Sequence, residues 1–221
     1  MIVKYGAGII CTRYNPIKEA KEVLLIAKTH SPYYINTITG NYKSRLNLNK
    51  ISKHEWILIK RYSILELHCR YFNISPEEYK TNILLQKHVN CINNRYIKMK
   101  NEGKIIYPHT FNNELYWEIP KGHKENVDKT LIDTACREFK EETTLDPGII
   151  ENDTYIINEN STSRKKYIVN YYLCVRKYSQ NEDFIKVNSW DNILCGKWFT
   201  LKELDFISMD NKIKGKLNGI F

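Results

Sequence analysis

The segment Arg-Glu-Phe-Lys-Glu-Glu-Thr-Thr-Leu, residues 137–145, places three glutamates within five positions. In a helix, Glu138, Glu141 and Glu142 lie at i, i+3 and i+4, on one face. Like charges at this spacing repel by about 0.2–0.5 kcal/mol per pair in an isolated helix. A hard divalent cation offsets the repulsion best, because Mg²⁺ takes oxygens from carboxylates and keeps water and phosphate oxygens. By themselves the glutamates equally suit a solvated acidic face, so the neighbouring residues must decide.

The elements around this segment suggest a strand, a loop and a helix. Residues 115–119 are expected to form a short strand, which Pro-Lys-Gly at 120–122 breaks into a loop. Asp128 is a good residue to cap a helix that begins near Lys129. The buried stripe of this helix is predicted from its apolar spacing to comprise Leu131, Ala135 and Phe139, with Ile132 beside them.

This order of residues resembles the box of the Nudix hydrolases, G-x5-E-x7-R-E-U-x-E-E-x-G-U, where U is apolar. Gly122 matches the opening glycine, residues 137–142 match the core, and Leu145 matches the last apolar position. Three departures stand out. The spacer between Gly122 and the core is one residue longer, Asp128 stands where glutamate is usual, and Thr144 replaces the second glycine. Thr144 is expected to strain the helix end, since glycine suits a positive φ there.

The resemblance implies roles for particular residues. A cation, Mg²⁺ or Mn²⁺, would be held by the three glutamates and a backbone carbonyl, namely Glu138, Glu141, Glu142 and Gly122. The ion would lower the pKa of a bound water. Either Glu141 or Glu142 would act as the general base; the sequence leaves both open.

Further roles follow for neighbouring residues. Arg137 is expected to pair with Asp128 and to orient the helix carboxylates. Lys121 is a candidate phosphate ligand. Trp117 is a candidate substrate platform or a core residue. Asp191 is a candidate late-loop carboxylate, although a turn-forming role suits it better.

The resemblance implies an α/β fold, the Nudix α/β/α sandwich with a mixed sheet, built from residues 1–30 and 109–221. Residues 2–12 and 22–28 are predicted to form a hairpin, with further strands at 165–177 and 196–200 and a last helix after Phe199. Residues 31–108 are expected to be a mostly helical insertion. One helix is predicted across 51–71, and a second from Pro76, capped by Ser75, to about Lys100.

The net charge of +9 is concentrated in this insertion, which holds thirteen Lys and Arg against five Glu. Ten aromatic residues are interleaved with these bases. A basic surface with aromatic rings suits a polyanion with stackable bases, although solubilising lysines and core tyrosines would produce the same composition. The layout resembles the mRNA-decapping enzymes of large DNA viruses, which are described as holding RNA with such an insertion. That likeness implies capped RNA as the partner.

Three functions compete at this stage. The first is decapping, which releases m7GDP and 5′-monophosphate RNA. The second is hydrolysis of diphosphoinositol polyphosphates or dinucleoside polyphosphates, for which a large insertion is not needed. The third is RNA binding without catalysis, against which the three intact glutamates argue.

The remaining composition concerns the compartment. Six cysteines are scattered without Cys-x-x-Cys pairs, and no apolar run approaches the ~18 residues of a membrane span. The N-terminal residues have the pattern of a strand rather than of a signal peptide. We therefore expect reduced thiols and an intracellular protein that binds no membrane, within the cytoplasm of an infected host cell if the viral likeness holds.

Overall fold

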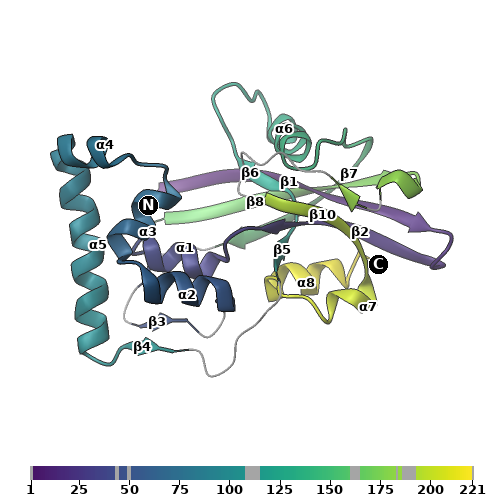
Figure 1. The fold of residues 1–221 in the computed structure, drawn as a ribbon. Helices are drawn as coiled ribbons and strands as arrows, with labels where there is room; N and C mark the ends of the chain where they lie inside the picture. Colours follow the sequence, from purple (N-terminus) through teal and green to yellow (C-terminus); the bar gives the residue numbers. More distant parts are fainter. Residues whose placement is uncertain are drawn as a thin grey trace. The chain divides into compact units, whose positions relative to one another are not determined.

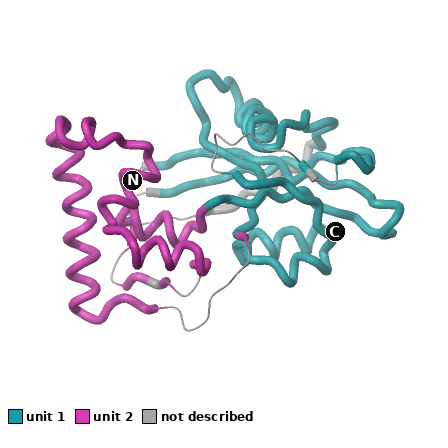
Figure 2. Tube along the Cα trace, viewed as in Figure 1, with its two compact units in different colours: residues 1–29, 116–221 teal, residues 30–115 magenta. Residues whose placement is uncertain are grey.

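The computed structural model describes residues 2–42, 45–48, 51–107, 115–159, 165–182, 184–185 and 193–220. The chain forms two compact units, residues 1–29 with 116–221, and residues 30–115 (Figure 2). Among the described residues, no helix is both long enough and apolar enough to cross a membrane.

The first unit is built on a mixed sheet in the order β7-β8-β1-β2-β10-β9 (Figure 1). Its strands are β1 (Ile2–Asn15), β2 (Ala20–Lys28), β5 (Tyr116–Glu118), β6 (Lys121–His123), β7 (Ile149–Glu159), β8 (Lys165–Arg176), β9 (Phe184–Ile185) and β10 (Ile193–Thr200). β1 runs parallel to β8 and antiparallel to β2, so the predicted hairpin and the mixed sheet are confirmed. The strands at 165–177 and 196–200 are also confirmed, while β7 and β9 were not predicted.

Helices cover both faces of this sheet, α6 (Leu131–Thr143) on one and α7 (Leu201–Leu204) with α8 (Asn211–Leu217) on the other (Figure 1). The strands follow a period of two, which sends alternate side chains to opposite faces. Ile9 packs with Phe139 of α6, whereas Ile10 packs with Leu204 of α7. This is the α/β sandwich that the sequence predicted.

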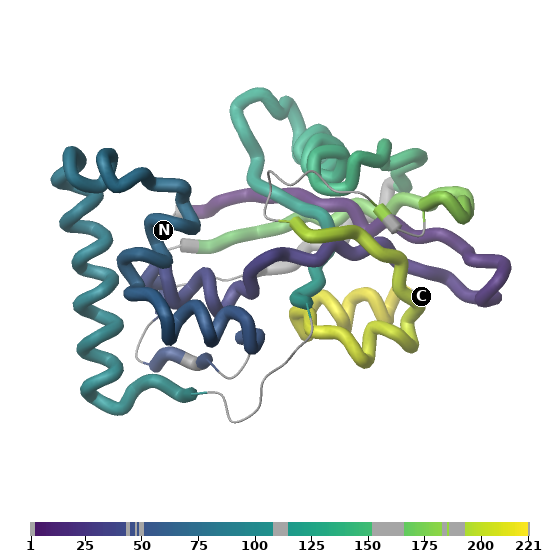
Figure 3. The backbone as a smooth tube through the Cα atoms, viewed as in Figure 1, coloured from purple at the N-terminus to yellow at the C-terminus, as the bar shows by residue number. Residues whose placement is uncertain are grey.

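β1 and β2 pair only near their turn, and residues 116–123 enter where the two strands diverge. Thr12 to Asn15 pair with Ala20 to Val23. Beyond that point β5 pairs with β2 and β6 pairs with β1. The residues at 121–123 were expected to form a loop, but pairing with β1 makes them a strand. The loop that follows leads to α6 (Figure 3).

The second unit is mostly helical and has a core of its own. Its elements are α1 (Pro32–Ile38), β3 (Leu46–Asn47), α2 (Lys53–Arg61), α3 (Ile64–Tyr71), α4 (Pro76–Thr81), α5 (Ile83–Asn101) and β4 (Ile105–Ile106). The N-cap at Ser75 is confirmed, but each of the two long helices predicted here is in fact two. Ser63 caps α3 and Asn82 caps α5, so new helices begin there.

Candidate active site

The helix α6 carries the three glutamates, and its first turn differs from the prediction. The N-cap is Thr130, whose hydroxyl accepts from the Asp133 amide while the Asp133 carboxylate accepts from the Thr130 amide. This reciprocal capping box satisfies two amides that would otherwise have no partner. The prediction that Asp128 caps the helix was therefore wrong, and Asp128 has another role. Ile132 lies on the exposed side of the helix rather than in its buried stripe.

Asp128 is buried and binds Arg137 through two hydrogen bonds. Arg137 Nε lies 3.0 Å from Asp128 Oδ1, and Nη2 lies 2.9 Å from Oδ2. The same carboxylate accepts from the Thr134 hydroxyl and the Glu125 amide, each at 3.0 Å. The Arg137 contact, above all, holds the pKa of Asp128 well below its usual range. A charged pair with this many hydrogen bonds fixes the direction of the guanidinium.

The other side of the same guanidinium faces two of the helix glutamates. Arg137 Nη1 lies 3.0 Å from Glu138 Oε1 and 2.9 Å from Glu141 Oε2. Two carboxylates therefore meet at one cationic nitrogen. The hydrogen bond to Asp128, above all, and the charges of these two glutamates raise the pKa of Arg137.

Glu142 faces elsewhere and is buried. Its Oε1 lies 2.5 Å from Lys28 Nζ, at the end of β2, and its Oε2 accepts from the Lys121 amide at 2.8 Å. Lys28 Nζ also lies 3.5 Å from Glu118 of β5. Burial raises the pKa of Glu142 to about 7, although the positive charge of Lys28 opposes that rise. Sequence reasoning missed Lys28 and Glu118, because no local pattern links them to α6.

Gly122 lies directly against the Glu138 carboxylate, in the space that a Cβ atom would occupy. Its carbonyl oxygen lies 3.5 Å from the Tyr167 hydroxyl. Since Glu142 binds the amide of Lys121, two carboxylates of α6 flank two successive residues of β6. A glycine is needed here for close approach rather than for an unusual φ.

The other predicted site residues are placed as follows. Trp117 is buried in the core, edge-on to Phe199 with ring centroids 4.6 Å apart. This placement makes Trp117 a core residue and argues against a role as a substrate platform. Lys121 is half-buried on β6, beside the glutamates. Asp191 lies outside the described residues.

The carboxylates present suit a divalent cation only in part. Glu138 and Glu141 direct oxygens to one cationic nitrogen, and one or two carboxylates are what Mg²⁺ takes from a protein. In the described part of the chain, no three His, Cys, Asp or Glu side chains are grouped to hold an ion. The expected three-glutamate cluster is therefore two glutamates, because the third is neutralised by Lys28.

The sheet, the helix and this arrangement agree with the comparison to known families. The chain belongs to the NUDIX domain family, whose model matches residues 80–217, more than half of the chain. The matched range contains β6, α6 and all three glutamates. A comparison with curated protein sequences finds no significant match.

Solved structures similar to this chain include Nudix proteins of low sequence identity. The NUDIX domain of Shewanella oneidensis NrtR, complexed with ADP ribose, is 12% identical with a TM-score of 0.49, covering 99% of this chain and 88% of that one. A C. elegans Ap4A hydrolase binary complex is 14% identical with a TM-score of 0.47, covering 97% and 93%. MutT protein from Methanosarcina mazei Go1 is 12% identical with a TM-score of 0.43, covering 97% and 89%.

Proposed function

We propose that this protein is an mRNA-decapping Nudix hydrolase of the kind found in large DNA viruses. The observation that carries the proposal is the inserted unit, residues 30–115, which has its own core and exposes many cations. Its exposed Lys and Arg include Lys53, Lys60, Arg61, Lys80, Lys87, Lys98 and Lys100. Some lie over aromatic rings, such as Arg70 over Tyr62 at 4.0 Å. Cations beside aromatic rings suit single-stranded RNA.

In this proposal the cap is hydrolysed at its pyrophosphate. A water oxygen forms a bond to phosphorus and a bridging P–O bond breaks, which releases m7GDP and 5′-monophosphate RNA. Mg²⁺ or Mn²⁺, when bound, neutralises phosphate oxygens and lowers the pKa of the attacking water. Glu138 and Glu141, with the Gly122 carbonyl, hold the ion, and Glu141 or Glu142 accepts the water proton. Lys121 contacts a phosphate.

The test uses RNA of several dozen nucleotides with a labelled cap, first with Mg²⁺ and then with Mn²⁺. Wild type is compared with Glu141→Gln and Glu142→Gln, and the released nucleotide is identified. We expect m7GDP from wild type, a large loss in both variants, and no release in EDTA. Hydrolysis of diphosphoinositol or dinucleoside polyphosphates without m7GDP release would replace decapping with the small-molecule function. RNA binding without any hydrolysis would indicate a non-catalytic protein.

A second experiment tests the inserted unit. We expect Lys80, Lys87, Lys98 and Lys100, changed together to Gln, to weaken binding of long RNA while cleavage of a short cap dinucleotide is kept. The slope of log K against log salt should become shallower by about 0.7 for each lysine that contacts a phosphate. The matched control neutralises four exposed lysines of the first unit, Lys21, Lys202, Lys212 and Lys216. Equal RNA binding in both quadruple variants would contradict the proposed role.

A further inference from the structure

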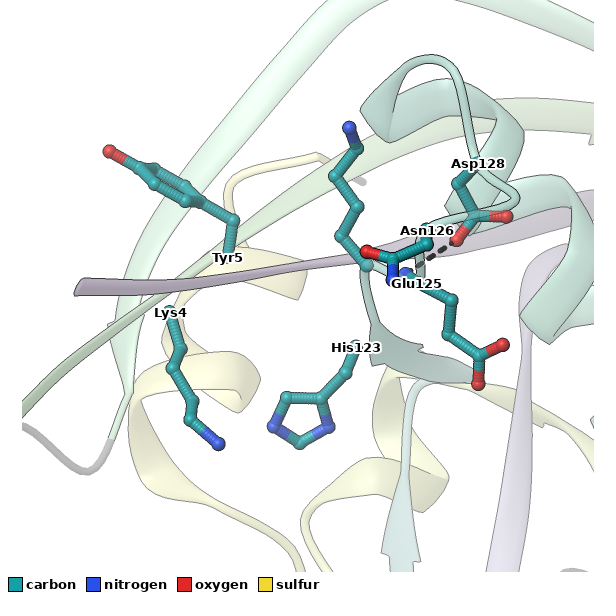
Figure 4. Close-up of a pocket in the computed structure, with 7 residues that line it drawn as sticks. Lys4, Tyr5, His123, Glu125, Asn126 and Asp128 are labelled. Carbon is teal, nitrogen blue, oxygen red and sulfur yellow. Dashed lines mark hydrogen bonds between the residues drawn. The ribbon is translucent and has the colours of Figure 1, made fainter. Parts of the chain in front are cut away.

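A pocket of about 610 Å³ lies between β1 and the loop that follows β6 (Figure 4). β1 contributes Lys4 and Tyr5 to its wall, and the loop contributes His123, Lys124 and Glu125. Figure 4 shows the side chains of Lys4 and His123 extending in the same direction. The volume is in the range of pockets that take small molecules, about 300–1,000 Å³.

The backbone holds this pocket in shape. His123 pairs with Gly6 in the β1–β6 register, and the Lys124 amide donates to the Tyr5 carbonyl at 3.2 Å. The His123 ring stacks on Tyr167, with centroids 4.7 Å apart and planes inclined by 29°. A site on paired strands keeps its geometry better than one on a free loop.

The pocket is positively charged. Lys4 and Lys121 lie close enough to His123 that their charges add to the effect of burial and lower its pKa. Lys124 contributes a further ammonium group, which lies 3.5 Å from the Lys129 carbonyl. The Asp128 carboxylate at the rim is already neutralised by Arg137. Glu125 is then the acid that opposes the lysines.

The pocket adjoins the candidate active site through one side chain. Arg137 Nη2 donates to the His123 carbonyl at 3.0 Å, while Nη1 of the same guanidinium contacts Glu138 and Glu141. A substrate bound at these glutamates would therefore extend toward Lys4 and Lys124. Tyr5, about half exposed, offers a ring surface at the same pocket.

We propose that this pocket binds a nucleotide of the substrate, next to the pyrophosphate that is cleaved. Lys4 and Lys124 contact its phosphate, and the rings of His123 and Tyr5 pack against its base. The inference rests on the proposed function for the identity of the substrate. Binding itself needs no cleavage, so the two can be tested apart.

The test measures binding of GMP to the full chain by calorimetry in EDTA, where no hydrolysis occurs. We expect the double variant Lys4→Gln/Lys124→Gln to weaken GMP binding by about tenfold or more, since two charge-assisted contacts are lost. Glu125→Gln removes the opposing acid and should tighten binding severalfold. The control, Lys21→Gln/Lys212→Gln, removes two exposed lysines elsewhere in the same unit and should bind as wild type does.

Further ligands identify which part of the substrate is bound. Loss of affinity in the lysine double variant for m7GDP assigns the pocket to the cap nucleotide, and loss for a 5′-monophosphate dinucleotide assigns it to the RNA. Guanosine should bind weakly to wild type, and inorganic phosphate more weakly than GMP. GMP affinity of the folded lysine double variant within twofold of wild type would overturn the proposal, whatever the decapping assay shows.

Discussion

Arg137 and Asp128 are joined by two hydrogen bonds of 3.0 and 2.9 Å, across nine residues of sequence. The pair ties the loop after β6 to the third turn of α6. Its guanidinium also contacts Glu138 and Glu141, so Asp128 indirectly positions both candidate metal ligands. The aspartate stands where the Nudix box has glutamate, and the ion pair is nonetheless formed.

Replacing Asp128 with Asn should destabilise the protein by about 1–3 kcal/mol, because Arg137 loses its charged partner. Urea denaturation at pH 7 measures this free energy. Asp128→Glu, which keeps the charge, serves as the control and should cost less.

The effect of Asp128→Asn should also depend on pH. The pKa of Asp128 is lowered in the folded protein from an ordinary value of 3.8. A lowered pKa contributes stability above the unfolded value, and that stability is lost as pH falls below it. The difference between wild type and Asp128→Asn should therefore be full near pH 6 and shrink below about pH 4. A constant difference would show that the charge is not responsible.

Lys28→Met should cost about 3–5 kcal/mol in free energy of unfolding at pH 7, because Glu142 and Glu118 keep buried charge without a partner. The double variant Lys28→Met/Glu142→Gln should recover much of this loss. The comparison is Lys140→Met, which breaks an exposed pair with Asp146 and should cost under about 1 kcal/mol. Equal costs for Lys28→Met and Lys140→Met would mean that Lys28 is solvated.

Gly122→Ala should separate activity from stability. The added Cβ would displace the Glu138 carboxylate, which is the end of a flexible side chain, so folding is expected to change little. Misplacing a carboxylate by about 1 Å should lower the hydrolysis rate by about 10²-fold. At Gly6 an added Cβ would meet the Gly122 carbonyl, and Gly6→Ala should therefore destabilise the fold as well. A Gly122→Ala protein with wild-type activity would exclude Glu138 from the reaction.

Thr144→Gly should stabilise the protein. Thr144 ends α6 with φ of +60°, a conformation that costs L residues about 1–2 kcal/mol. Glycine removes that cost but loses chain entropy, so we expect a gain of about 0.5–1 kcal/mol. Thr144→Ala keeps a Cβ and should show no gain. Thermal unfolding of the three proteins distinguishes the cases.

Local sequence signals predicted much of the structure, and some were overlooked. The alternation in 2–12 and 22–28 predicted the hairpin, and the positive φ at Thr144 was expected from its place in the box. The breaks between helices also have local signals. Ser52 with Glu55, and Ser63 with Glu66, are capping boxes that mark two helix starts where apolar spacing suggested one helix.

The sequence by itself determined the helix that carries the glutamates, since its caps and apolar stripe depend on residues three or four positions apart. Only the tertiary structure decided what each glutamate faces. Lys28 lies 114 residues from Glu142, and they meet because β1 and β2 diverge and admit β5 and β6. Such contacts depend on which strands pair and in which register, which local hydrogen bonding does not specify. The same pairing places Lys4 and Lys124 around one pocket.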